Sequence, residues 1–170
     1  DTDVLLIGAE AAGGYAAVKA SEHDDVHVTV LTKGLDIGTS GATVTGSRST
    51  FAFYARGLRE QIGTDTDIQD GPDEFIDDTL REGKWANEQN LVESYVCEGP
   101  MRAKEIEDWG FRWEKDDPNN FHASPGHSYR REIFGYKKTG PQMCTVFKNI
   151  LAGRPNVDVV GNMLALDLLT

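Results

Sequence analysis

The stretch VLLIGAEAAGG, from Val4 to Gly14, contains the residues whose types and spacing first indicate chemistry. An apolar run reaches Gly8, and Gly13 follows in the same short stretch. Glycine at the first position allows a tight turn out of a strand, and glycine at the last lets the next helix pack closely on the sheet. The start of that helix offers N–H groups and a partial positive charge to a pyrophosphate. The stretch therefore predicts a nucleotide-binding turn, and a turn without a ligand is the alternative.

Glu10 stands where the middle glycine of the G-x-G-x-x-G pattern is expected. Such folds usually place an acidic residue after the second strand to hold the ribose diol, whereas this chain has Thr32, Lys33 and Gly34 there. We hypothesise that only the backbone of Glu10 faces the phosphates and that its carboxylate turns toward the adenosine side to accept a ribose hydroxyl. Thr32 and Lys33 would then serve the ribose and the phosphate. In the opposite interpretation, the carboxylate faces the phosphates and repels them.

The elements that must position these residues follow from the apolar periodicity. Residues 4–7 and 26–31 are typical of buried strands and residues 11–22 of a helix, which together make a parallel βαβ unit with a right-handed crossover. A loop rich in Gly, Ser and Thr is expected at residues 39–49. Further helices are predicted at 73–83, 87–109 and 142–151, and further strands at 157–160 and 163–169. The order of elements predicts an α/β fold with a parallel sheet.

The composition limits the class of protein and its partners. The chain has 170 residues, enough for one domain, and a net charge of −11, which argues against nucleic acid and anionic membranes as partners. No apolar run is long enough to span a bilayer, so we expect no direct membrane insertion. Cys97 and Cys144 lack metal-ligand spacing and are expected to be core thiols in a reducing compartment, and no metal site is predicted. The chain starts without Met and ends on an apolar run, which indicates a fragment or a processed piece.

Several stretches in order along the chain carry a family resemblance: TKG, TSGATVTGSRS, DTLREGKWANEQNLVESYVCEGPMRAKEIEDWGFRW, GHSYRR, KTG, PNVDVV and LALDLL. In this order they resemble the flavoprotein subunits of the succinate dehydrogenase, fumarate reductase and L-aspartate oxidase family. The resemblance covers nearly the whole chain. It implies the N-terminal part of a Rossmann-like FAD/NAD(P)-binding domain, with a parallel sheet, inserted helices and an incomplete fold. Residues 1–50 would form the βαβ unit and flavin loop, 51–135 the inserted helices and loop, and 136–170 the return to the sheet.

The resemblance also implies which residues bind the cofactor. FAD would contact the glycine turn and the start of the first helix, then the end of the second strand, then the flavin loop, and finally the last strand near the adenine. The residues are Gly8, Glu10, Ala11, Ala12, Gly13, Thr32, Lys33, Gly34, Thr39, Ser40, Gly41, Ala42, Gly46 and Ala165. Small residues suit a loop whose N–H groups must approach a flat ring.

Two departures from the family pattern qualify these expectations. Respiratory members carry flavin covalently on a histidine of the loop, and the aligned residue here is Gly41, so FAD is expected to bind without a covalent bond. The family's proton-delivering arginine and substrate clamp lie in segments that follow this chain, so no catalytic residue is assigned. His127 and Arg130 or Arg131, in the GHSYRR stretch, either help to order the flavin pocket or are structural.

The resemblance implies an FAD-dependent oxidoreductase that transfers hydride between flavin and a small dicarboxylate-like substrate, with this chain supplying FAD binding. Its partners would be that small molecule and an electron-transfer subunit. A cytoplasmic location is expected, and its variant is attachment to the membrane surface through a partner subunit. The alternatives are an NAD(P)-dependent dehydrogenase and a non-catalytic flavin-binding or assembly subunit.

Overall fold

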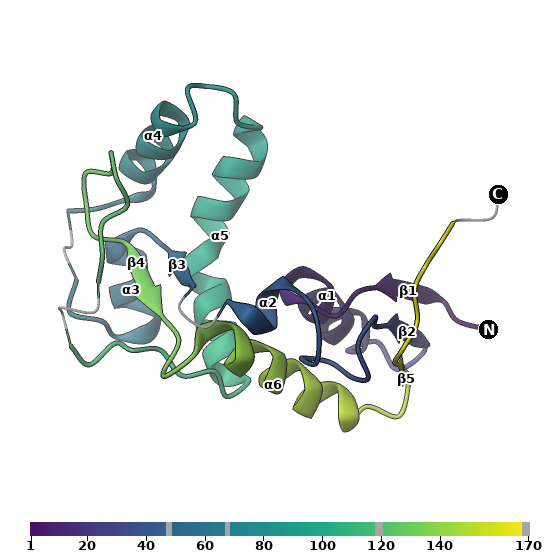
Figure 1. The fold of residues 1–170 in the computed structure, drawn as a ribbon. Helices are drawn as coiled ribbons and strands as arrows, with labels where there is room; N and C mark the ends of the chain where they lie inside the picture. The colour runs from purple at the N-terminus through teal and green to yellow at the C-terminus, as the bar shows by residue number, and fades with distance from the viewer. Residues whose placement is uncertain (47–48, 67–68, 118–120, 168–170) are drawn as a thin grey trace. The chain divides into compact units, whose positions relative to one another are not determined.

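The protein is described by a computed structural model that covers residues 1–46, 49–66, 69–117 and 121–167. The chain divides into two compact units (Figure 1). The first, which we call the sheet unit, comprises Asp1–Ser49 and Lys137–Thr170. The second, which we call the insert unit, comprises Thr50–Tyr136. Each unit is described by itself.

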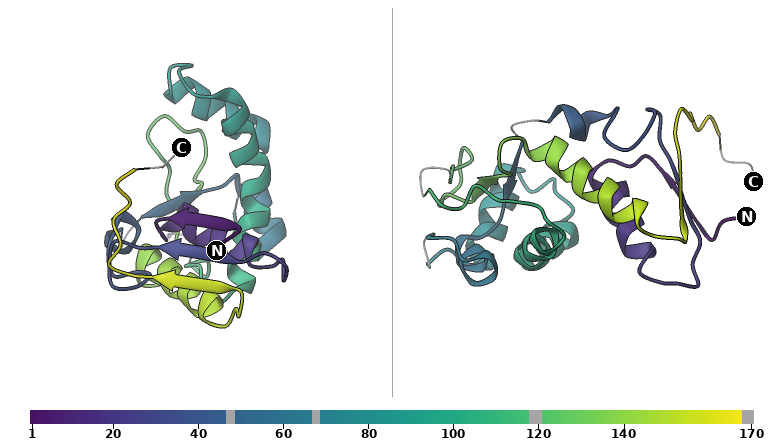
Figure 2. Two further views of the ribbon diagram at one scale, coloured as in Figure 1. Left: turned by 90° about the vertical axis from the view of Figure 1, so that its right-hand side faces the viewer. Right: turned by 90° about the horizontal axis from the view of Figure 1, so that it is seen from below.

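The sheet unit contains a parallel sheet of three strands in the order β1-β2-β5 (Figure 2). These strands are β1 (Val4–Ile7), β2 (Val28–Leu31) and β5 (Val157–Val160). Helix α1 (Ala11–Ala20) connects β1 to β2, as parallel strands require a crossover. The α/β class and the first βαβ unit predicted from the sequence are confirmed.

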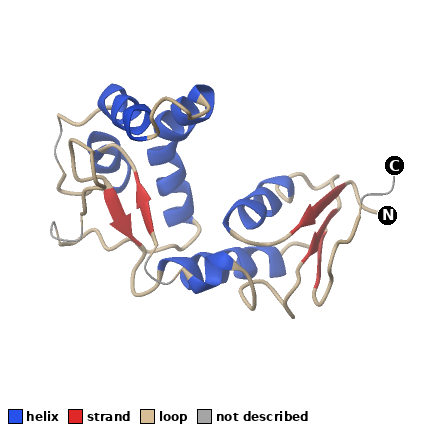
Figure 3. Ribbon diagram, turned by 45° about the horizontal axis from the view of Figure 1, so that its top comes forward, coloured by secondary structure: helices blue, strands red, loops and turns tan. Residues whose placement is uncertain are grey.

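One face of this sheet is covered by helices. Val28 and Val30 point to the same face because side chains alternate along a strand, and both are fully buried. Helix α1 packs beside α6 (Thr139–Ala152), and the Phe147 ring fills the space next to Gly14 (Figure 3). On the opposite face, Leu5 and Ile7 are about half exposed, at 48% and 56%. Within the described residues, the sheet is therefore packed on one face only.

A short helix, α2 (Ala42–Thr45), lies within the sheet unit against the start of α6. The Gly140 N–H donates to the Gly46 carbonyl at 3.1 Å. A Cβ atom at Gly140 would lie 1.7 Å from the Thr43 carbonyl oxygen, so only glycine permits this approach. The contact holds α2, and with it the loop that precedes it, against the first turn of α6.

The insert unit is built on an antiparallel strand pair and helices. Strand β3 (Thr50–Ala52) pairs with β4 (Glu132–Phe134), with Thr50 opposite Phe134. Its core includes Phe75, Leu80, Val92 and Val96. The helices are α3 (Ala55–Ile62), α4 (Pro72–Glu82) and α5 (Gln89–Asp108).

The structure corrects several expectations about elements. The loop expected at 39–49 contains α2, and α6 begins at Thr139 rather than near residue 142. The sequence analysis missed α3, β3 and β4. Residues 163–167 form no strand, because the chain there bonds to residues before the flavin loop through the Met163 N–H, which donates to the Thr32 carbonyl, and Leu166 is 87% exposed. The rest of that expected strand, 168–169, lies outside the described residues. Cys144 is buried as expected, but Cys97 is exposed.

Candidate functional site

A cavity of about 400 Å³ lies at the carboxyl ends of β1 and β2 in the sheet unit. In open α/β sheets this end of the strands is where ligands bind, because the turns there present the backbone of glycine loops and helix starts. The cavity is lined by Gly8, Ala9, Glu10, Thr32, Lys33, Gly38, Ser40 and Gly41. Six of these residues belong to the predicted cofactor-binding set. Ala9 and Gly38 were missed.

The glycine turn at the start of α1 has the close packing that the sequence predicted. Gly8 has a φ of +99°, which few L-residues adopt. A Cβ atom at Gly13 would lie 2.0 Å from the Gly8 carbonyl oxygen. In the described residues, the N–H groups of Ala12 and Gly13 have no hydrogen-bond partner. They are first-turn donors of α1 and are suited to an anionic oxygen.

The Glu10 side chain points at α2. Its Oε1 accepts the Ala42 N–H at 2.9 Å, and its Oε2 accepts the Thr43 N–H at 2.8 Å and the Thr43 hydroxyl at 3.0 Å. The Thr43 N–H holds the pKa of Glu10 below its ordinary value of 4.5, aided by the Thr43 hydroxyl and the Ala42 N–H and opposed by burial. In this structure the carboxylate oxygens are therefore engaged by the flavin loop, in a direction that the ribose hypothesis did not foresee.

The residues after β2 form a tight turn beside the cavity. The Thr32 N–H donates to the Val160 carbonyl at 3.0 Å, which fixes the end of β2 on β5. A Cβ atom at Gly34 would lie 2.3 Å from the Thr39 hydroxyl and 2.7 Å from that of Ser40. The Thr39 hydroxyl is itself bonded to the Asp36 backbone, which places it in the turn and not on the cavity wall.

Other predicted residues lie outside the lining of the cavity. Ala11 and Ala42 donate their N–H groups to Thr43 and Glu10. Gly46 is at the far end of α2, where its carbonyl accepts the Gly140 N–H. Ala165 lines a separate cavity of about 320 Å³ with Ile7, Leu166 and Asp167. That second cavity begins at the residue before Gly8, so the predicted set covers both sides of the end of β1.

Gly38, which the sequence analysis missed, has a signal that could have found it. It has a φ of +77°, and a Cβ atom there would lie 2.9 Å from the Cβ of Cys144. Its position in a glycine-rich loop after the second strand was the available indication. Burial raises the pKa of the Cys144 thiol, and the charge of Glu10 adds to this effect.

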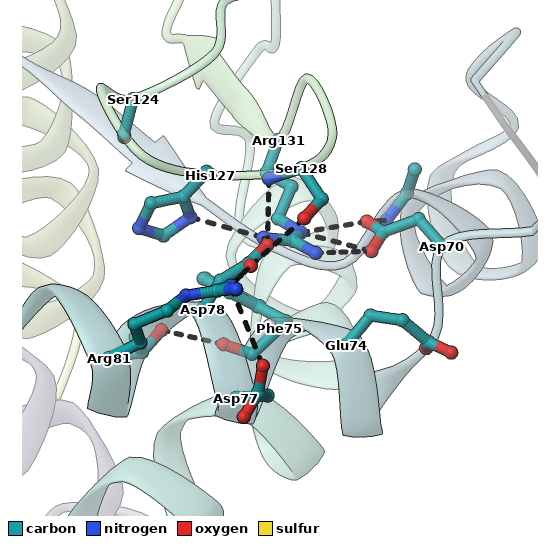
Figure 4. Close-up of polar contacts among 12 residues, drawn as sticks. Asp70, Glu74, Phe75, Asp77, Asp78, Arg81, Ser124, His127, Ser128 and Arg131 are labelled. Atoms are coloured by element: carbon teal, nitrogen blue, oxygen red, sulfur yellow. Dashed lines mark hydrogen bonds and ion pairs between the residues drawn. The ribbon is translucent and has the colours of Figure 1, made fainter.

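The GHSYRR stretch belongs to a buried ion network in the insert unit (Figure 4). The Arg131 side chain is 1% exposed. Its Nε and Nη2 donate to the Asp70 carboxylate at 2.6–3.0 Å, and its Nη1 donates to Asp78 at 2.7 Å. His127 Nδ1 lies 3.1 Å from Nη1. These contacts connect the segment before β4 to α4 and to the residue before it.

The network balances its own charges. Burial alone would lower the pKa of Arg131, but Asp70 and Asp78 raise it above its ordinary value. Burial lowers the pKa of His127, and the charge of Arg131 lowers it further. Arg130, the other arginine of the stretch, is exposed. The geometry gives Arg131 a structural role in the insert unit.

Two further features are absent from the part of the chain that the structure describes. No helix there is long and apolar enough to cross a bilayer. No group of three or more His, Cys, Asp or Glu side chains gathers there in a way that could hold a metal ion.

Comparison with known proteins places this geometry in a family. Residues 3–170 match the FAD binding domain family. The chain is 29% identical over 173 residues to a CoM/CoB fumarate reductase subunit of Methanothermobacter marburgensis, covering 99% of this chain and 29% of that protein. It is 31% identical to the L-aspartate oxidase of Vibrio cholerae, covering 99% of this chain and 30% of that protein. The chain thus spans about a third of the length of these relatives or less.

Solved structures agree on the fold. The Mycobacterium smegmatis Sdh1 complex superimposes with a TM-score of 0.75 at 23% identity, over 95% of this chain and 27% of that chain. The E. coli quinol fumarate reductase superimposes with a TM-score of 0.73 at 21% identity, over 93% of this chain and 25% of that chain. The resemblance drawn from the order of motifs is confirmed, and the chain belongs to the FAD binding domain family, with fumarate reductase and L-aspartate oxidase flavoproteins among its relatives.

Proposed function

We propose that this chain binds FAD without a covalent bond in the 400 Å³ cavity, with the pyrophosphate at the start of α1. The observation that carries the proposal is the pair of N–H groups at Ala12 and Gly13, unpartnered among the described residues, beside a turn that tolerates no Cβ. Two donors at a helix start match the oxygens of a pyrophosphate. The family match supports FAD as the nucleotide that carries it.

The remaining predicted residues receive proposed roles around this anchor. Gly8 allows the turn, and Thr32, Lys33 and Gly34 lie toward the adenosine ribose. The flavin loop from Thr39 to Gly46 approaches the ring system, with Ser40 and Gly41 on the cavity wall. Ala165 lies toward the adenine. In this proposal, both units are parts of one FAD-binding domain.

The first test is spectroscopic. The intact protein is expected to be yellow, and acid or heat should release its flavin into the supernatant, because Gly41 offers no nucleophile for a covalent bond. Absorbance of the supernatant and of the washed pellet measures the two fractions. A colourless protein that fails to take up added FAD would contradict the binding proposal, and flavin retained on the denatured chain would contradict its non-covalent character.

The wider activity is proposed from the relatives. FAD supplies hydride transfer, and the names of the relatives support a small dicarboxylate or amino dicarboxylate as its partner, with an electron-transfer subunit beside it. A cytoplasmic location, with attachment to a membrane through that subunit, is part of this proposal. Reoxidation of the chemically reduced intact protein by fumarate, or bleaching of the oxidised form by succinate or L-aspartate, tests the substrate class. Bound FAD that responds to none of these would favour the non-catalytic alternative.

The runner-up cofactor is NAD(P). Its usual ribose-binding acid after the second strand is replaced by Thr32 and Lys33, and the family match names FAD. Titration of the apoprotein with NAD(H) and NADP(H), next to FAD, compares the two directly. Submicromolar affinity for a nicotinamide nucleotide without affinity for FAD would reverse the assignment.

A further inference from the structure

Glu10 connects two parts of the cofactor site that are more than 30 positions apart in the sequence. Its carboxylate accepts the N–H groups of Ala42 and Thr43 and the Thr43 hydroxyl. The same Thr43 oxygen accepts the Ala11 N–H at 3.1 Å. The first residue of α1 and the first residues of α2 are thus tied together through one carboxylate and one hydroxyl.

The Glu10 carboxylate also occupies the space that a side chain at position 41 would need. A Cβ atom at Gly41 would lie 1.7 Å from Glu10 Oε1 and 2.4 Å from Cδ. The φ of Gly41 is +96°, so a side chain there is strained by its backbone as well. The strain would persist whatever stands at position 10, but the overlap depends on Glu10.

The orientation of the carboxylate explains how a negative charge fits beside a phosphate site. Its oxygens are bonded to donors of the loop, whereas the N–H groups of Ala12 and Gly13, unpartnered among the described residues, are left for a ligand. Glu10 and Gly41 both line the cavity, so the position of the carboxylate helps to set the shape of its wall. Without it, the first N–H groups of α2 would lose an acceptor that a short helix cannot replace internally.

We propose that Glu10 is a positioning residue of the cofactor site, which holds the loop from Gly38 to Thr45 against the start of α1, and that its bonded position excludes a side chain at position 41. The inference rests on the proposed FAD site and deepens it. It predicts that positions 10 and 41 are energetically coupled, because Gly41→Ala must push the carboxylate off Ala42 and Thr43.

The test is a double-variant cycle in the intact protein, with Glu10→Gln, Gly41→Ala and the combination. Glu10→Gln keeps the shape but presents an NH2 group to backbone donors. It is expected to weaken FAD binding by about tenfold to a hundredfold, the value of one charged hydrogen bond. In the Gly41→Ala background the same change should alter binding by less than about twofold, because the bonds are already broken. FAD titration of the apoprotein, followed by flavin fluorescence, measures each dissociation constant.

Thermal unfolding of the four apoproteins separates this inference from the proposed function. The midpoint should fall for each single variant and fall little further for the double variant, whether or not FAD binds. If wild-type protein takes up no FAD but the coupling in the unfolding midpoint is present, the proposed function fails and the Glu10 contact stands. Equal losses for Glu10→Gln in both backgrounds, or tighter FAD binding in Glu10→Gln, would overturn the inference.

Discussion

The sheet unit and the insert unit each neutralise carboxylates that lie away from bulk water, and they do so by different means. In the sheet unit, the half-buried Glu10 meets two backbone N–H groups and one hydroxyl. In the insert unit, the buried Asp70 and Asp78 share the guanidinium of Arg131. One arrangement uses the backbone and leaves a cavity beside it. The other uses opposite full charges and fills its own space.

The difference separates a binding region from a stabilising one. Backbone donors carry partial charge, so further donors of the same kind, at Ala12 and Gly13, remain near Glu10 for a ligand. A guanidinium between two carboxylates is occupied by its partners, since its Nε, Nη1 and Nη2 are all engaged. Variants of the two regions should therefore fail differently: through lost flavin in one and through unfolding in the other.

The largest effect is expected from removing the guanidinium. Arg131→Met leaves Asp70 and Asp78 as uncompensated buried charges and should lower the stability of the insert unit by about 3–5 kcal/mol. Denaturant unfolding followed by tryptophan fluorescence measures the loss, because Trp113 lies in this unit. The control is Lys104→Met, which removes the exposed ion pair with Asp108 and should cost less than about 1 kcal/mol. Equal losses for the two variants would show that the buried network adds nothing.

A smaller loss of stability but a complete loss of flavin is expected in the sheet unit. Gly13→Val places a Cβ atom against the Gly8 carbonyl and must displace α1, at a cost of about 1–3 kcal/mol. Gly153→Val is the matched control in the same unit, because a Cβ there meets only ordinary contacts, at 3.5 Å or more, and its φ is −90°. Flavin content after gel filtration is the measurement. Normal flavin in Gly13→Val would reduce the glycine turn to a structural feature.

The smallest effect should appear only in acid. Burial would raise the pKa of Asp78, but hydrogen bonds from Ser128 and Arg131 outweigh it and lower the pKa below 3.8. Since the folded pKa is below the unfolded one, the contribution of Asp78 is complete above the unfolded value and is lost as the pH falls through the folded value. Unfolding of the insert unit should therefore become easier below about pH 4. Circular dichroism in an acid titration measures this, and Asp78→Asn should flatten the dependence; an unchanged slope would contradict it.

The sequence was sufficient where the physical signal was local. The glycine turn, α1 and the parallel strands follow from neighbours within a few positions, and Gly8 and Gly13 were identified because few other residues permit that geometry. The order of motifs then identified the family. Residues 163–167 show the limit of periodicity, because alternating apolar residues form a strand only where a partner strand is available.

The remainder depended on contacts between distant positions. Nothing in the neighbourhood of Arg131 indicates Asp70, which lies 61 positions away. The hypothesis for Glu10 recognised that its backbone and side chain play different roles, but the donors that its carboxylate binds could not be identified before α2 was located. Gly46 was assigned to the cavity from its place in the loop, and its contact with Gly140 could not be read from either segment alone.

The pairing of β3 with β4 has a consequence for the order of folding. The sheet unit is made from two chain segments, and the insert unit separates them in sequence. Because Thr50 lies opposite Phe134, the insert brings its own ends together when its strands pair. Each halving of an effective loop length lowers the entropy cost of closing it by about 0.6 kcal/mol. An insert that folds first therefore shortens the search by which α6 and β5 reach α1 and β2, and slowing its folding should delay the assembly of the nucleotide cavity.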